Sequence, residues 1–160
     1  MTATAAPTRK TTSTPANFPS TDTTWLTLTE RVREAGGYRT RAEAEHITRT
    51  VLSVLGTHVT GDERVALARA LPEEAARVLA SQIPALRPLP APDFVEAVAS
   101  RLDNSTPATA RWDTGTVLTV LADLLPPPVL TDVLTHLPTG YALLFGRAEL
   151  GGPRRAHRTA

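Results

Sequence analysis

The sequence predicts an all-α protein made of two tandem four-helix repeats that pack as one globular helical domain. Three observations lead to this prediction. Apolar residues recur at helical spacing, no segment alternates apolar and polar residues as a strand does, and residues 28–79 match residues 94–145 without a gap. That match holds 14 identities in 52 aligned pairs. We interpret it as an internal duplication with a period of 66 residues.

Composition divides the chain into five segments. Residues 1–24 hold nine Thr and no Leu, Ile or Val, which predicts a disordered tail because so little apolar surface can be buried. Residues 81–92 carry four prolines and are typical of an extended linker. The predicted organisation is a disordered tail over 1–24, a helical repeat over 25–80, a Pro-rich linker over 81–92, a second helical repeat over 93–147 and a flexible basic tail over 148–160.

The first repeat is expected to contain four short helices. The glycine pair at 36–37 ends the first, and Thr40 with Glu43 is typical of a capping box at the start of the second. Thr60 with Glu63 predicts the same device at the start of the third, and Pro72 opens the fourth. The core-facing residues are expected to be Leu28, Val32 and Ala35, then Ala44, Ile47, Val51, Val54 and Leu55, then Val65, Ala68 and Leu71, and finally Ala75, Val78 and Leu79.

The second repeat follows the same plan with different start signals. Thr106-Pro107 begins its long helix, the triplet at 126–128 begins the next, and Pro138 opens the last. Its core-facing residues are expected to be Phe94, Val98 and Leu102, then Ala110, Val117, Val120, Leu121 and Leu124, then Val129, Val133, Leu134 and Leu137, and finally Tyr141, Leu144 and Phe145.

The composition excludes several classes of protein. The chain has no cysteine, so a disulfide scaffold, a cysteine nucleophile and a thiolate metal site are ruled out. A net charge of +1 argues against a strongly basic nucleic-acid-binding protein. No apolar run approaches the roughly 20 residues that span a bilayer, and no apolar segment follows Arg9 and Lys10 as in a secretory signal. We therefore expect a cytoplasmic protein without membrane contact.

The sequence offers no catalytic constellation. It has no Gly-rich phosphate loop, no nucleophile elbow and no pair of histidines at metal-ligand spacing. His46 lies near two glutamates, but a lone histidine of this kind is typical of a solvated helix face. Glu30 and Glu96 form the only acidic pair kept in both repeats, and we favour an ion pair of Glu30 with Arg33 over an acidic site. We predict that the chain has no catalytic, cofactor-binding or metal-binding residue. We also predict that the protein is not an enzyme.

Charge is spread unevenly along the chain. Residues 28–79 hold eight Arg and eight acids, residues 94–145 hold two Arg and five acids, and residues 146–160 hold four Arg and one Glu. The net charges are therefore 0, −3 and +3. In the first repeat, Glu45 with Arg49 and Glu73 with Arg77 are expected to pair along their helices.

Five residues are predicted to contact a partner. Trp112 faces away from the apolar stripe of its helix, so we expect it to be covered by the other repeat, the linker or the N-terminal segment, or else to bind a partner. The four arginines near the C-terminus provide a basic tail that either contacts nucleic acid or an acidic partner, or neutralises the acidic second repeat. They are Arg147, Arg154, Arg155 and Arg158.

The duplicated motifs resemble a bacterial family known as domain of unknown function 2267. The resemblance covers about residues 25–147, and it rests on a Phe-Leu-x-x-Val start, an Arg/Thr-x-Val-Leu-x-x-Leu helix and a Leu-Pro pair with a short closing helix in each half. The matching segments are Leu28 to Val32, Thr48 to Leu55 and Leu71-Pro72, then Phe94 to Val98, Thr114 to Leu121 and Leu137-Pro138, which closes on Tyr141 to Gly146. The chain departs from the family pattern at the prolines 126–128, where we expect a reshaped connection. The resemblance implies a small helical protein and supplies no activity or site residues.

These observations favour a non-catalytic interaction or regulatory protein whose partner is another protein. The alternative is an RNA- or ribosome-associated factor that uses the Arg-rich surface and the basic tail. A ligand pocket between the repeats is a third hypothesis.

Overall fold

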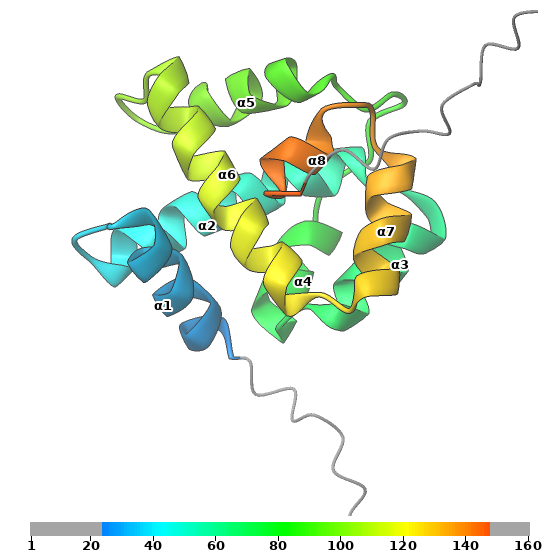
Figure 1. Cartoon of the computed structure of the whole chain (residues 1–160), viewed down its shortest axis with the longest axis horizontal. Coiled ribbons are helices and arrows are strands. Elements are labelled where there is room, and N and C mark those ends of the chain that lie inside the picture. The colour runs from blue at the N-terminus through cyan, green and yellow to red at the C-terminus, as the bar shows by residue number, and fades with distance from the viewer. Residues whose placement is uncertain (1–23, 148–160) are drawn as a thin grey trace, which may run out of the picture.

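The computed structural model describes residues 24–147, which form eight α-helices and no strand, so the predicted all-α fold is confirmed (Figure 1). The helices are α1 (Trp25–Gly36), α2 (Arg41–His58), α3 (Gly61–Ala70), α4 (Glu73–Ala80), α5 (Ala91–Ala99), α6 (Pro107–Leu124), α7 (Pro127–His136) and α8 (Tyr141–Leu144). Of the two predicted tails, only Thr24 lies inside the described residues, where it is the N-cap of α1.

The two longest helices, α2 and α6, lie at the centre of the fold and pack on each other. Around them α1 and α5 each contact both long helices, α4 packs on α2, and α8 packs on α6. Helices α3 and α7 pack together and join the two halves at a second place. The bounds of α6 and α7 follow those of α2 and α3 by 66 residues, the offset at which the sequence matches itself. The duplication stays our interpretation of this correspondence.

The helix starts follow local side-chain chemistry. Thr40 accepts a hydrogen bond from the backbone N–H of Glu43 (3.2 Å), and Thr106 accepts one from that of Thr109 (3.1 Å). The Glu43 carboxylate accepts from the backbone N–H of Arg39 (3.3 Å), one residue before the expected capping-box donor. At the prolines 126–128, α7 begins in the register of α3, so this connection keeps its position in the fold.

The core consists mainly of aliphatic residues from all eight helices together with the aromatic rings of Trp25, Phe94, Tyr141 and Phe145, and most of the predicted core positions are buried. Helix α3 is the exception, because the face that it buries differs from the face that the sequence predicts. Val65 is 46% exposed, whereas Leu67 is buried where α3 packs between α4 and α7. Ala35 is exposed as well. The remaining predicted core residues that are only half-buried are Ala68, Val78, Leu124, Val129 and Leu134.

Arg64 joins the C-terminal ends of two helices. Its guanidinium donates hydrogen bonds to five backbone carbonyl groups, two from the end of α2 and three from the end of α4 and the residues after it. The acceptors are Gly56, Val59, Leu79, Ala80 and Gln82. Carbonyls at a helix end lack intrahelical partners and carry partial negative charge, so one cation satisfies both ends.

The ion pairs of the first half differ from the predicted set in one respect. Arg77 pairs with Glu73 along α4, as expected. Arg49 pairs with Glu74 of α4 rather than with Glu45 of its own helix, and its guanidinium lies 4.6 Å from the ring centroid of Trp25. Arg49 therefore links α1, α2 and α4, which a prediction from helical spacing alone could not include.

The Pro-rich linker is fixed at two points and is shorter than predicted, since α5 already begins at Ala91. The backbone N–H of Ala85 donates to the carbonyl of Thr57 (2.7 Å), and the hydroxyl of Tyr141 donates to the carbonyl of Leu89 (2.7 Å). Between residues 24 and 147, none of the helices combines the length and apolar character needed to cross a membrane.

Candidate functional site

A groove of about 490 Å³ runs along the exposed side of α6 next to the C-terminal end of α1. We call it the α6 groove. Apolar and small side chains dominate its surface, and one cation, Arg111, and one carboxylate, Asp123, lie on it. Its lining residues are Ala35 of α1 and, from α6, Ala108, Arg111, Trp112, Gly115, Thr116, Thr119, Val120 and Asp123.

Trp112 is the largest side chain of the α6 groove. Its indole N–H donates a hydrogen bond to the carbonyl of Gly36 (3.3 Å), so the ring contacts the first half of the chain as expected. Even so, 58% of the residue remains exposed, and the described residues leave most of the ring uncovered. An exposed tryptophan held at one edge is typical of protein-binding surfaces.

A half-buried tyrosine and a buried aspartate form a hydrogen-bonded pair directly beside Trp112. The hydroxyl of Tyr38, just after α1, donates a hydrogen bond to the carboxylate of Asp113 on α6 (2.6 Å). Burial raises the pKa of Asp113, and the negative charge of Glu43 raises it further. Burial and the neighbouring carboxylate also raise the pKa of Tyr38. The pair connects the α1–α2 turn to the helix that carries Trp112.

The importance of Asp113 was not predicted from the sequence. Asp113 is only 4% exposed and is the one fully buried carboxylate among residues 24–147. A signal was present, however, because position 113 aligns with Ile47, a core residue of the first half. When one copy of a repeat has an apolar core residue and the other has a carboxylate at the same position, that carboxylate is a candidate for a specific buried hydrogen bond.

A second hollow of about 300 Å³ lies on the other side of Arg111. It is formed by the start of α5 and by α8, with Leu143 59% exposed at its edge. Arg111 lines both hollows, and within the described part of the chain it forms no ion pair. The two hollows therefore form one mainly apolar surface divided by a cationic side chain.

A second polar cluster joins α3 to α7. Thr60 and His136 share a hydrogen bond between Oγ1 and Nε2 (3.0 Å), so the expected Thr60 cap to Glu63 does not form. The His136 Nδ1 and the nearer Glu63 carboxylate oxygen are 3.9 Å apart, which is too long for a hydrogen bond. The order hydroxyl, imidazole, carboxylate resembles a hydrolase triad, but neither hollow described above is lined by these residues. We interpret the cluster as a polar contact between the two halves.

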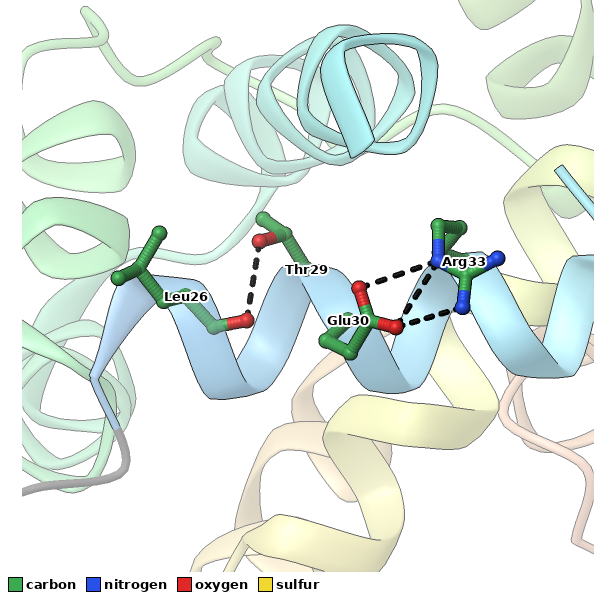
Figure 2. Close-up of polar contacts among 4 residues, drawn as sticks. All are labelled: Leu26, Thr29, Glu30 and Arg33. Carbon is green, nitrogen blue, oxygen red and sulfur yellow. Dashed lines mark hydrogen bonds and ion pairs between the residues drawn. The ribbon is translucent and has the colours of Figure 1, made fainter. Parts of the chain in front are cut away.

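The other candidate site residues that the sequence analysis considered, Glu30, Glu96 and His46, do not line the α6 groove. Arg33 and Glu30 form the expected ion pair on α1, with a Nη2–Oε1 distance of 2.6 Å (Figure 2). The Thr29 hydroxyl next to them donates to the Leu26 carbonyl (3.2 Å). Glu96 and His46 are exposed. No group of three metal-ligating side chains occurs within the described range.

One of the four predicted basic contact residues borders the α6 groove. The Arg147 guanidinium lies 3.2 Å from the carboxylate of Asp123, so this cation pairs with the acidic second half, one of the two roles considered for it. Arg154, Arg155 and Arg158 lie outside the described residues.

Comparison with known proteins identifies the family. The model of the uncharacterized conserved protein family DUF2267 matches residues 25–144, which cover α1 to α8. The chain belongs to the DUF2267 family. No curated protein matches the chain significantly. The match confirms the resemblance drawn from the repeated helix motifs, and the α6 groove lies entirely within the matched residues.

Proposed function

We propose that this DUF2267 protein is a non-catalytic interaction module that binds another protein through the α6 groove. The observation that carries the proposal is Trp112, which is 58% exposed on a mainly apolar groove while the hydrogen bond to Gly36 holds its ring in place. Large aromatic side chains that are positioned before binding lose little freedom when a partner covers them.

Two further features of the groove support a protein partner over a small molecule. The groove and the neighbouring hollow are open and extend over α1, α5, α6 and α8, which suits an extended or helical segment of a protein. Arg111 lies between them and offers a carboxylate of the partner a bidentate contact. We therefore expect a partner segment with apolar side chains and at least one acidic residue.

Affinity capture from the native cell, at low and at high salt, tests the proposal. The full-length chain should retain a protein partner at high salt because apolar burial dominates, and Trp112→Ala should lose it. Leu26→Ala is the matched control, because Leu26 is 52% exposed on α1 and does not line the groove. Equal capture by wild type and Trp112→Ala would contradict the proposal.

The same experiment tests the alternatives. Association with RNA or the ribosome through the basic tail predicts binding that weakens steeply with salt and is insensitive to Trp112→Ala. The pairing of Arg147 with Asp123 favours the protein-binding proposal, since that cation already has a partner. Turnover of a small-molecule substrate by the purified chain, abolished by a point substitution, would overturn the non-catalytic assignment.

A further inference from the structure

The described chain ends on the rim of the α6 groove. After α8, the backbone N–H of Arg147 donates to the carbonyl of Ala142 (2.8 Å), and its side chain pairs with Asp123. Gly146, at a φ of +68°, lies so close to Thr119 that a Cβ would be 2.8 Å from the threonine hydroxyl. Asp123 and Thr119 both line the groove, so the following thirteen residues, 148–160, start beside it.

The length of that segment is sufficient to cover the groove. The lining residues of α6 extend from Ala108 to Asp123, which corresponds to about 22 Å at 1.5 Å per residue. An extended chain covers that distance with roughly seven residues at about 3.3 Å each. Residues 148–154 are therefore enough, and the direction from Asp123 towards Ala108 leads past Arg111 and Trp112.

The chemistry of the segment matches the groove. Residues 148–160 contain one acid, Glu149, and one large apolar residue, Leu150, and both follow directly after the anchor at Arg147. The groove presents a cation without a described ion-pair partner, Arg111, and an exposed aromatic ring, Trp112. The three arginines that follow give the segment a net charge of +2, opposite in sign to the −3 of residues 94–145.

We propose that residues 148–154 of the same chain occupy the α6 groove, with Leu150 against the indole of Trp112 and Glu149 paired with Arg111. The segment then acts as a built-in competitor that a partner protein must displace. The competitive role rests on the proposed function of the groove, whereas the occupancy itself is testable without any partner.

Nuclear magnetic resonance of the full-length protein tests the occupancy. The chain has two tryptophans, and the indole N–H signals of exposed Trp112 and buried Trp25 are assigned with Trp112→Phe. Leu150→Asp should shift the Trp112 signal and leave the Trp25 signal in place. Ala156→Asp, which adds the same charge to the segment beyond the part that covers the groove, should shift neither. An unchanged Trp112 signal in Leu150→Asp would overturn the proposal.

A charge exchange tests the predicted ion pair. Glu149→Arg and Arg111→Glu should each shift the Trp112 signal, and the double variant should return it towards the wild-type position. If the shift of the Trp112 signal in the double variant equals the sum of the shifts in the two single variants, the proposed ion pair is overturned. A Trp112 signal that moves with protein concentration would assign the occupant to a second copy of the chain, which also contradicts occupancy within one chain.

Partner capture separates this inference from the proposed function. If both hold, Leu150→Asp should capture at least several-fold more partner than wild type, because the competitor is removed. If Trp112-dependent capture is the same for Leu150→Asp and wild type and the Trp112 signal does not respond, the inference fails and the proposed function stands. If the signal responds but no Trp112-dependent partner exists, the occupancy stands and the proposed function fails.

Discussion

The hydroxyl of Tyr38 donates a 2.6 Å hydrogen bond to the carboxylate of Asp113 and so connects the turn after α1 to the helix that carries Trp112. The two residues are 75 positions apart in the sequence. Because Asp113 is buried and its neighbour Trp112 is exposed, the polar pair fixes the position of the α6 groove relative to α1. We therefore expect the stability of this contact to affect the proposed binding of a partner at the groove.

Removing the donor of this pair should destabilise the protein more than neutralising the acceptor. Tyr38→Phe leaves the Asp113 carboxylate buried without the donor, and we expect it to lower the free energy of unfolding by about 1–3 kcal/mol. Asp113→Asn keeps an oxygen that accepts from Tyr38 and removes the buried charge. Urea denaturation at neutral pH measures both variants, and a larger loss for Asp113→Asn than for Tyr38→Phe would refute this account of the pair.

Because the pKa of Asp113 is raised in the folded protein, the effect of Asp113→Asn on the free energy of unfolding should depend on pH. The native carboxyl binds its proton more readily than the unfolded one, so Asp113 favours the native state at pH values below its unfolded pKa. That contribution is lost as the pH rises through the folded pKa. The stability of Asp113→Asn relative to wild type should therefore increase from pH 3 towards neutral pH, as measured by urea denaturation across that range. A constant difference would contradict the raised pKa.

His58 should make the protein sensitive to acid. It is 5% exposed at the end of α2, with its ring 5.6 Å from that of Phe94, and burial lowers its pKa. A depressed histidine pKa means that stability is present above the unfolded pKa and lost as the pH falls through it towards the folded value. Wild type should lose stability below about pH 6.5, and His58→Leu should lose less. Parallel melting-temperature profiles for the two proteins would refute this.

Arg64 should be the most costly surface arginine to remove. Arg64→Met removes the guanidinium hydrogen bonds to five carbonyl groups at the ends of α2 and α4, and we expect a loss of about 2–4 kcal/mol in the free energy of unfolding. Arg69→Met is the matched control on the same helix, where the side chain is exposed, and should change stability by less than about 0.5 kcal/mol. Equal losses would show that the carbonyl contacts contribute nothing specific.

Two glycines in the long helices should respond to alanine in opposite directions. A Cβ on Gly56 would lie 2.4 Å from the Leu79 carbonyl oxygen, so Gly56→Ala must push α2 and α4 apart and should destabilise by about 1–3 kcal/mol. On Gly115 the nearest atom would be 4.0 Å away, so Gly115→Ala should stabilise α6 by up to about 1 kcal/mol. Thermal denaturation of the two variants checks the contrast, and destabilisation by Gly115→Ala would contradict it.

Helix periodicity and start signals predicted most of the fold, because both depend on neighbouring residues. Thr40 and Thr106 cap the two long helices as their spacing indicated. The prediction failed where a side chain has a partner far away in the sequence. Thr60 bonds to His136 rather than capping α3, and Arg49 turns to α4. In the ten-residue α3, several faces fit the apolar pattern, and packing against α4 and α7 selected Leu67 instead of Val65.

The candidate site was predictable only in part. The wheel position of Trp112 indicated a side chain outside its own core stripe, and the structure places it on the α6 groove. The groove itself depends on the angle at which α1 meets α6 and on the contact of Gly146, after α8, with Thr119 of α6. The spacing of residues along a single helix determines neither. Arg111 is a candidate because it lines both hollows, which no sequence pattern around it indicates.

The affinity of the full-length chain for its captured protein partner, compared between wild type and Gly115→Leu, tests the central claim most directly. Gly115 lines the α6 groove, and a Cβ there would meet the Leu144 carbonyl oxygen at 4.0 Å, an ordinary van der Waals distance, so we expect a leucine to fill the groove without displacing the core. We predict at least a tenfold loss of affinity with no loss of thermal stability. An unchanged affinity in the folded variant would show that the partner binds elsewhere and would contradict the proposed function.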